Sequence, residues 1–203
     1  MSLANVQKAT ESDTSQIAQT LANAFYDDPA ISWMCPDDEK RRRIGPYGFK
    51  AWLEKIYMPK GNVYTDATRK AAALWSPPGK WRMSVGTQAR LTPAMIRISG
   101  LKRLPLIVKG LTMMDKAHPD DRPHWYLGIL GTDPDHQGKG LGSAVMSPIL
   151  ERCDAEGLGA YLESSKEANI PFYNRHGFEV TGELKLPDGP SVWPMWRDPQ
   201  PPN

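Results

Sequence analysis

The feature that most restricts how this chain can fold is a glycine-rich turn between two apolar segments. Residues 124–131 have the pattern of a buried strand, and residues 160–164 predict a second one. Between them, apolar side chains recur at helical spacing from Leu141, and Gly157 is predicted to end this helix. A strand, a helix and a second strand in this order form a βαβ unit, which almost always closes right-handed with parallel strands. We therefore expect an α/β protein with a parallel strand pair in its sheet.

The turn itself carries glycines at alternate positions, in the run Gln137-Gly138-Lys139-Gly140-Leu141-Gly142. Glycine lets main-chain amides approach a ligand without side-chain clash, and at a helix start such amides favour phosphate oxygens. A Walker A loop is excluded, because it needs glycine where Asp133 stands and Ser or Thr after Lys139. A dinucleotide loop needs the spacing GxGxxG, which is absent, although Glu163 lies where a ribose-binding acid would be. A turn without a ligand does not require so many glycines ahead of an amphipathic helix.

The rest of the chain surrounds this unit with short elements. Strands are expected at 6–9, 63–65, 71–75, 178–186 and 192–196, and helices at 13–26, 37–58 and 169–177. Residues 80–116 carry many bases and almost no acids, with apolar side chains at three- and four-residue steps. This pattern predicts two amphipathic helices, interrupted near Gly100 or Pro105. The segment is either a solvated basic face over a core stripe or a lid that forms the acceptor-side wall of a binding site.

Length and composition indicate a single domain spanning residues 1–203. The 203 residues include 25 basic and 23 acidic side chains, and this near-neutral balance argues against binding nucleic acid by bulk charge. No apolar run approaches the ~18 residues of a membrane helix, and the first residues lack an apolar signal core. The 2 cysteines and 4 histidines show no metal-ligand spacing, so no metal is expected. We expect a cytoplasmic protein without a membrane partner.

Two motifs in the C-terminal half resemble the GCN5-related N-acetyltransferases, the GNAT family. The phosphate-loop pattern of that family is matched at Gln137, Gly138, Gly140 and Gly142. Its Asn-Tyr-Gly-Phe pattern is matched at Asn169, Tyr173, Gly177 and Phe178. Within the family, residues 134–143, 162–165, 169–173 and 189–193 look most like puromycin N-acetyltransferase-like members. The resemblance is close over residues 124–198, and it implies a mixed, mostly antiparallel sheet with a splayed parallel strand pair, flanked by helices.

The resemblance implies acetyl-CoA as the acetyl donor, held by residues 124–198. Main-chain groups of Leu130, Gly131 and Thr132 would contact the pantetheine arm. The amides from Gln137 to Ser143 would surround the pyrophosphate, with Lys139 adding a charge. The expected donor-binding set is therefore Leu130, Gly131, Thr132, Gln137, Gly138, Lys139, Gly140, Leu141, Gly142, Ser143 and Asn169.

Two residues are expected to move protons. Tyr173 is the candidate acid, because a phenol can protonate the departing thiolate; the alternative is a core aromatic. Asn169, four residues earlier, would share a helix face with Tyr173 or serve as a helix N-cap. Glu163 is the candidate base: if Leu162 faces the core, Glu163 points to the opposite side of the sheet, toward the acceptor. Its alternative is a structural hydrogen-bond acceptor.

These features predict an acetyltransferase acting on the primary amine of a small molecule, with a puromycin-like amine as one candidate. Such an activity would make antibiotic resistance one use of the enzyme. The alternatives are acetylation of a peptide or protein amine and a non-catalytic acyl-CoA sensor. The basic segment 80–116 disfavours a lysine-rich substrate, because like charges repel. The expected partner is a small-molecule amine, with the chain acting as a monomer or homodimer.

Overall fold

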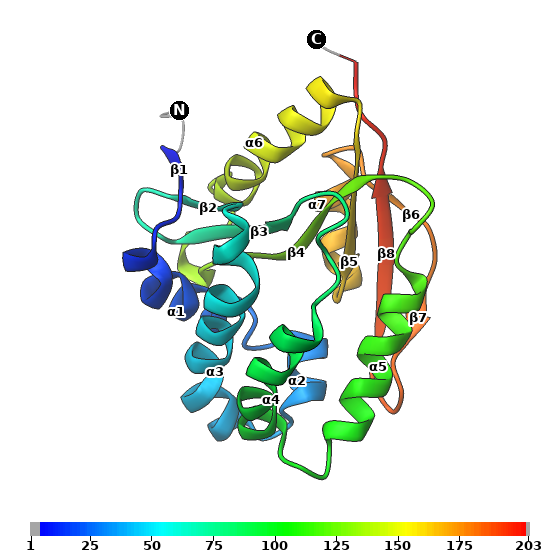
Figure 1. The fold of residues 1–203 in the computed structure, drawn as a ribbon. Coiled ribbons are helices and arrows are strands. Elements are labelled where there is room, and N and C mark those ends of the chain that lie inside the picture. The colour runs from blue at the N-terminus through cyan, green and yellow to red at the C-terminus, as the bar shows by residue number, and fades with distance from the viewer. Residues whose placement is uncertain (1–4, 202–203) are drawn as a thin grey trace.

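In the computed structural model, which describes residues 5–201, the predicted βαβ unit lies at the centre of one sheet (Figure 1). The 8 strands are β1 (Val6–Lys8), β2 (Val63–Asp66), β3 (Ala71–Ser76), β4 (His124–Thr132), β5 (Gly159–Ser164), β6 (Glu179–Val180), β7 (Leu184–Lys185) and β8 (Ser191–Arg197). Their order is β1-β2-β3-β4-β5-β8-β6, and β7 also pairs with β8. Among the described strands, β4 and β5 form the parallel pair and the other pairs are antiparallel. The predicted mixed, mostly antiparallel α/β fold is confirmed.

The α-helices of the described residues are α1 (Thr14–Ala24), α2 (Pro29–Met34), α3 (Asp38–Trp52), α4 (Val85–Ser99), α5 (Leu104–Ala117), α6 (Leu141–Glu156) and α7 (Ile170–Asn174). The two helices expected in the basic segment are α4 and α5, and Gly100 ends α4 with a φ of 78°. As predicted, α6 ends at Gly157, which takes the left-handed conformation at φ 65°. None of the described helices has the length and apolar content to cross a bilayer.

The helix expected over residues 37–58 is confirmed as far as Trp52 and is wrong beyond that residue. The α-helix ends at Trp52, and a π-helical turn (Leu53–Tyr57) and a 3-10 turn (Met58–Lys60) follow it. A π-turn widens the helix by one residue and shifts the direction of the side chains that follow. Here it brings Tyr57 against β4, where a Cβ on Gly128 would lie 1.9 Å from the Tyr57 hydroxyl.

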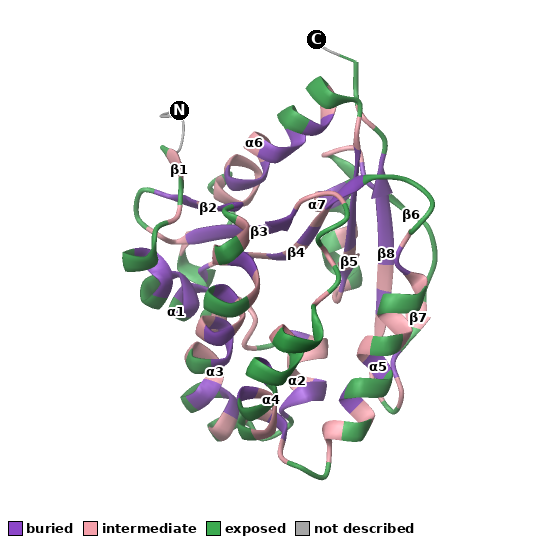
Figure 2. Ribbon diagram, in the orientation of Figure 1, coloured by how far each residue is buried: buried purple, intermediate pink, exposed green. Residues whose placement is uncertain are grey.

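Alternating side chains of the sheet face two helical layers. On one face, Trp75, Trp125 and Leu162 pack with Ile149 of α6 and Tyr173 of α7. The opposite face packs against α1, α3 and the π-turn, through Ile17, Leu21, Phe49, Leu53, Leu74 and Ile129. Most of β2, β3, β4, β5 and β8 and the inner sides of α1, α3 and α6 are buried, whereas β6, α4 and α5 expose much of their surface (Figure 2).

The C-terminal hairpin is confirmed, but its first strand is divided. Residues 178–186, expected as one strand, form β6 and β7, which pair with opposite ends of β8. Between them the amide of Thr181 donates to the carbonyl of Pro194 at 2.9 Å. Because proline has no N–H, Pro194 cannot donate the second hydrogen bond of this pair to Thr181, and the strand pairing is interrupted there.

Gly159 gives a stability prediction, because Trp196 occupies the place of its missing side chain. An ideal Cβ on Gly159 would lie 2.2 Å from Cζ2 of Trp196, which is buried beside β5. We expect Gly159→Ala to lower the free energy of unfolding by about 1–3 kcal/mol, as overpacked core sites do. Urea denaturation measures this change.

The matched control is Gly182→Ala, where the added Cβ would meet no atom within 4 Å. It is expected to change the free energy of unfolding by at most about 0.5 kcal/mol. Equal changes in the free energy of unfolding in the two variants would show that the packing of Trp196 does not require glycine at position 159.

Candidate active site

The parallel strands β4 and β5 stay paired over only part of their length. His124, Trp125 and Tyr126 pair with residues 159–161, and beyond that point β4 pairs with β3 while β5 pairs with β8. The register between β3 and β4 also shifts between Leu74 and Trp75, which leaves an extra residue on β4. The edge of β4 that faces β5 therefore lacks a strand partner near Leu130, Gly131 and Thr132. Such an edge leaves main-chain donors and acceptors for an extended ligand.

The glycine-rich turn follows β4 after a short 3-10 turn (Pro134–His136) and opens helix α6. Gly138 and Gly140 have φ angles of 73° and 79°, and the space above both is open, with no atom within 4 Å of an added Cβ. Gly142 differs: its backbone needs no glycine, and a Cβ there would make ordinary contacts of 3.5 Å with Phe172 and Thr132. The first two glycines shape the turn, and the third lies where α6 passes close to α7 and the end of β4.

Within residues 5–201, no amide N–H from Gly138 to Ser143 has a hydrogen-bond acceptor, and the first bond of α6 is Ala144 N–H to the Gly140 carbonyl at 3.0 Å. The Gln137 amide differs, because it already donates to the Pro134 carbonyl at 3.3 Å. Lys139 Nζ lies 2.9 Å from the Asp135 carbonyl. Consecutive free amides at the start of a helix suit phosphate oxygens, since the helix dipole adds to their partial positive charge.

Glu163 lies near the end of β5, on the face opposite α6. As the alternation of the strand predicts, Leu162 packs into the core beneath α6. The Glu163 side chain is 4% exposed, and its Oε2 accepts a hydrogen bond from the Tyr126 hydroxyl at 2.9 Å. Burial, followed by the charge of Glu163, raises the pKa of Tyr126 well above its ordinary value. Tyr126 therefore remains a neutral donor that orients the carboxylate.

Two histidines near Glu163 were not identified as site residues from the sequence. His118 follows the last residue of α5, and its Nδ1 lies 3.8 Å from Glu163 Oε1. Its Nε2 lies 2.8 Å from Nε2 of His124, the first residue of β4. Both imidazoles are buried. Their spacing of six residues fits no ligand motif, so only the folded structure, in which the chain after α5 returns to the sheet, reveals them.

Tyr173 is buried on the other face of the sheet, packed against Phe172 and Phe178. Burial, followed by the charge of Asp28, raises the pKa of Tyr173 well above its ordinary value, so the hydroxyl keeps its proton. Asp28 caps α2 and also accepts a hydrogen bond from Ser165, just past β5. Asp28 thus links the N-terminal half of the chain to the end of β5.

Asn169 is the N-cap residue of the short helix, as expected, but it does not cap the helix through its side chain. Asn169 ends a 3-10 turn (Glu167–Asn169), and its side chain makes no capping bond to α7. Its backbone is already helical, with φ −87° and ψ −14°, whereas a capping side chain usually needs an extended backbone. Asn169 is exposed, so its amide is accessible to a ligand.

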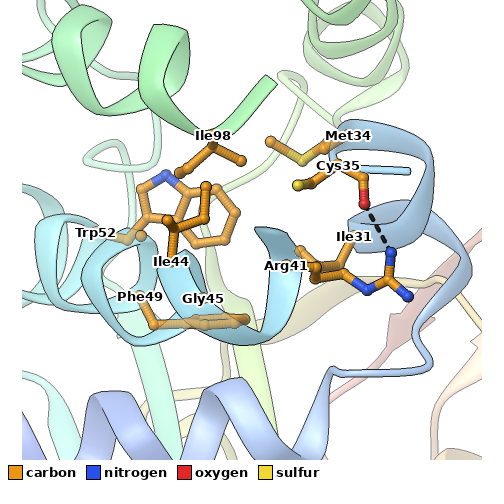
Figure 3. Close-up of a pocket in the computed structure, with 10 residues that line it drawn as sticks. Ile31, Met34, Cys35, Arg41, Ile44, Gly45, Phe49, Trp52 and Ile98 are labelled. Carbon is orange, nitrogen blue, oxygen red and sulfur yellow. Dashed lines mark hydrogen bonds between the residues drawn. The ribbon is translucent and has the colours of Figure 1, made fainter. Parts of the chain in front are cut away.

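A small apolar pocket lies elsewhere, between α2, α3 and α4 (Figure 3). Its walls include Ile31, Ile44, Trp52 and Ile98. The one charged side chain among its lining residues is Arg41, whose guanidinium donates to the Cys35 carbonyl at 2.7 Å. The pocket contains none of the predicted site residues, and within residues 5–201 no cluster of His, Cys, Asp or Glu is arranged to hold a metal ion.

Comparison with known proteins agrees with this geometry. The model of the acetyltransferase (GNAT) family matches residues 109–178. An uncharacterized N-acetyltransferase of Schizosaccharomyces pombe is 28% identical over 185 residues, which cover 86% of this chain and 74% of the relative. The L-methionine sulfoximine/L-methionine sulfone acetyltransferase of Pseudomonas aeruginosa is 40% identical over 136 residues, covering 60% of this chain and 74% of that protein.

A solved structure is similar over nearly the whole chain. The crystal structure of histone acetyltransferase HPA2 and related acetyltransferase from Corynebacterium glutamicum superimposes with a TM-score of 0.71 at 27% identity, covering 98% of both chains. The family model, the relatives and the fold agree, and together they show that this chain belongs to the GNAT family and is an acetyl-CoA-dependent N-acetyltransferase.

Proposed function

We propose that this enzyme transfers the acetyl group of acetyl-CoA directly to the primary amine of a small molecule. The observation that carries the proposal is the parting of β4 and β5, with free amides where α6 begins and Glu163 near the end of β5. Both strands run parallel, so these groups meet at the same edge of the sheet. In this proposal residues 1–203 form one domain, in which residues 124–198 are the donor half.

The donor would lie along the unpaired edge of β4. Main-chain groups of Leu130, Gly131 and Thr132 would bind the pantetheine arm, and one amide would polarise the thioester carbonyl. The free amides from Gly138 to Ser143, including that of Leu141, would hold the pyrophosphate. Gln137 contributes through its side chain, which donates to the Thr132 carbonyl at 3.2 Å and fixes the turn. Lys139 and the exposed Asn169 would add outer contacts.

Glu163 and Tyr173 would carry the two proton movements. Glu163 takes a proton from the ammonium group of the acceptor, and the freed amine attacks the thioester carbon. The carbon–sulfur bond then breaks, and the Tyr173 hydroxyl gives its proton to the departing thiolate. The raised pKa of Tyr173 keeps that proton available until the thiolate develops. Glu163 releases the first proton to solvent and takes the second proton of the bonded nitrogen, and the tyrosine is reprotonated from solvent.

The acceptor would enter on the face occupied by α1 to α5, because Glu163 points there. In this proposal, α4 and α5 form the acceptor-side wall. A small molecule is favoured over a protein because Glu163 is almost fully enclosed, and because the P. aeruginosa relative acts on L-methionine sulfoximine and L-methionine sulfone. The enclosed carboxylate suits a single amino group better than an extended peptide.

The test is mass spectrometry of puromycin incubated with acetyl-CoA and the purified enzyme, with L-methionine sulfoximine and a lysine peptide in parallel. Gain of one acetyl group by either small amine supports the proposal. Acetylation of the peptide alone would assign the enzyme to protein acceptors instead. Acetyl-CoA binding without transfer to any of a wide panel of amines would favour an acyl-CoA sensor.

Tyr173→Phe is expected to leave acetyl-CoA affinity unchanged and to lower kcat by about tenfold or more, because the thiolate loses its proton donor. Stopped-assay kinetics and calorimetry measure the two quantities. The control is Tyr64→Phe, which removes a hydroxyl from a tyrosine packed against the same core cluster. Unchanged turnover in Tyr173→Phe would remove Tyr173 from the mechanism.

A further inference from the structure

His118 and His124 form a buried hydrogen-bonded pair, and His118 also lies 3.8 Å from the Glu163 carboxylate. Nδ1 of His124 lies 2.9 Å from the Arg122 carbonyl, and a carbonyl oxygen can only accept, so Nδ1 of His124 carries a proton. Burial lowers the pKa of His124, which favours its neutral form, with a lone pair at Nε2. The 2.8 Å contact between the two Nε2 atoms therefore requires that His118 donates to His124.

This assignment determines what faces Glu163. With its proton on Nε2, a neutral His118 would direct the lone pair of Nδ1 at Oε1 of Glu163, 3.8 Å away. The other carboxylate oxygen already accepts from Tyr126 at 2.9 Å. Two lone pairs facing each other in a buried site are unfavourable, whereas a proton on Nδ1 would replace that repulsion with the attraction of an imidazolium for the carboxylate 3.8 Å away.

We propose that His118, held in one tautomer by His124, shares a proton with Glu163 and acts as the positioning residue for this carboxylate. The inference rests on the proposed role of Glu163 as the base. It gives the basic segment a further purpose: α5 delivers His118 to the site from outside the acetyl-CoA-binding half of the chain.

The surroundings fit a pair that stores a proton. Trp81 stacks on His118 with ring centroids 3.6 Å apart, and the rings of Tyr126 and Tyr161 meet it edge-on at 4.8 Å and 4.5 Å. Trp81 thus covers one face of the imidazole.

The charged groups that face the pair come from three further segments. Asp115 of α5 interacts with both His118 and Glu163. Burial raises the pKa of the Asp115 carboxyl; Glu163 adds to this effect and His118 opposes it. Arg82 lowers the pKa of Asp115. Burial, followed by the charge of Glu163, raises the pKa of Tyr57 in the π-turn. Among the described residues, none of these groups forms a hydrogen bond with His118 Nδ1 or with Glu163 Oε1.

The shared proton fits the reaction as a balanced step. Before transfer, the pair must lose its proton to solvent, which leaves neutral His118 and the Glu163 carboxylate. Glu163 then takes the proton of the acceptor ammonium and passes it to Nδ1 of His118, so the carboxylate becomes basic again for the second amine proton. The stored proton leaves to solvent after the products. The site therefore becomes active as pH rises through the loss of the shared proton.

The first experiment does not depend on activity. Nitrogen-15 NMR of the histidine side chains at neutral pH is expected to show His124 protonated on Nδ1 alone and His118 protonated on both nitrogens. In Glu163→Gln, the Nδ1 proton of His118 should be lost while His124 is unchanged. Identical His118 spectra in the two proteins would overturn the proposal, whether or not any amine is acetylated.

The second experiment follows kcat against pH in His118→Gln, because kcat reports groups in the substrate complex and not the free amine. The acidic limb is expected to move to lower pH, since the carboxylate no longer shares a proton, and the plateau to fall about tenfold. His136→Gln, at the surface turn, is the control. A lower plateau with an unmoved limb would make His118 merely structural.

The outcomes separate this inference from the proposed function. If the wild-type enzyme acetylates no small amine but the NMR result holds, the proton sharing stands and the acceptor class is wrong. If small amines are acetylated and the NMR and pH results are both negative, the proposed function stands and His118 has no part in it.

Discussion

Replacing Gly140 with aspartate is expected to weaken acetyl-CoA binding by at least about 100-fold, because three physical effects act together. The substitution places a carboxylate in the open space above the amides that would hold the pyrophosphate. It also adds a side chain at a φ of 79°, and a negative charge that competes with the pyrophosphate for the N-terminus of α6. Isothermal titration calorimetry with acetyl-CoA measures the effect.

Gly61→Asp is a matched control for this substitution. Gly61 has a φ of 68° and, like Gly140, nothing within 4 Å of an added Cβ. It ends the 3-10 turn before β2, away from the glycine-rich turn. The control therefore carries the same backbone strain and charge without the phosphate site. Normal affinity in Gly140→Asp would show that the pyrophosphate lies elsewhere.

Glu163→Gln is expected to lower kcat by about 100-fold while acetyl-CoA affinity is unchanged. Glutamine keeps the shape of the side chain and an oxygen that can accept from Tyr126, but a neutral amide cannot remove a proton from an ammonium group. Only amine that arrives already neutral can then react. Its fraction grows with pH, so the deficit in kcat/KM should narrow as pH rises toward the pKa of the acceptor.

Steady-state kinetics over a range of pH measure this effect, with Glu167→Gln as control. Glu167 is an exposed acid four residues further along the chain, in the 3-10 turn before α7. Its removal changes the net charge equally and leaves Glu163 in place. A Glu163→Gln enzyme with full turnover at neutral pH would show that Glu163 is the structural acceptor of the Tyr126 bond.

The sequence predicted the parts of the fold whose causes are local. The βαβ unit was predictable because hydrophobic periodicity and Gly157 specify a strand, a helix with a defined end and a second strand. The side to which Glu163 points was predictable for the same reason, since side chains of a strand alternate between its faces. The break between α4 and α5 was predictable from Gly100.

Other features could not be predicted because they depend on a partner distant in the sequence. The strand expected over residues 178–186 divides because Pro194, on the opposite strand, cannot complete the ladder. The helix expected to reach residue 58 changes to a π-turn where it meets the sheet, next to Gly128. Local propensity contains no information about either neighbour.

The sequence by itself determined the βαβ half of this protein: a glycine turn between two strands, with Glu163 on the second strand and Tyr173 on the short helix after it. These features are set by residues a few positions apart, through backbone conformation and periodicity. Only the tertiary structure decided what surrounds Glu163. It brings His118 from the end of α5, His124 and Tyr126 from β4, and Tyr57 from the π-turn to one carboxylate. Their meeting results from the packing of helices on a sheet, which depends on contacts between distant segments.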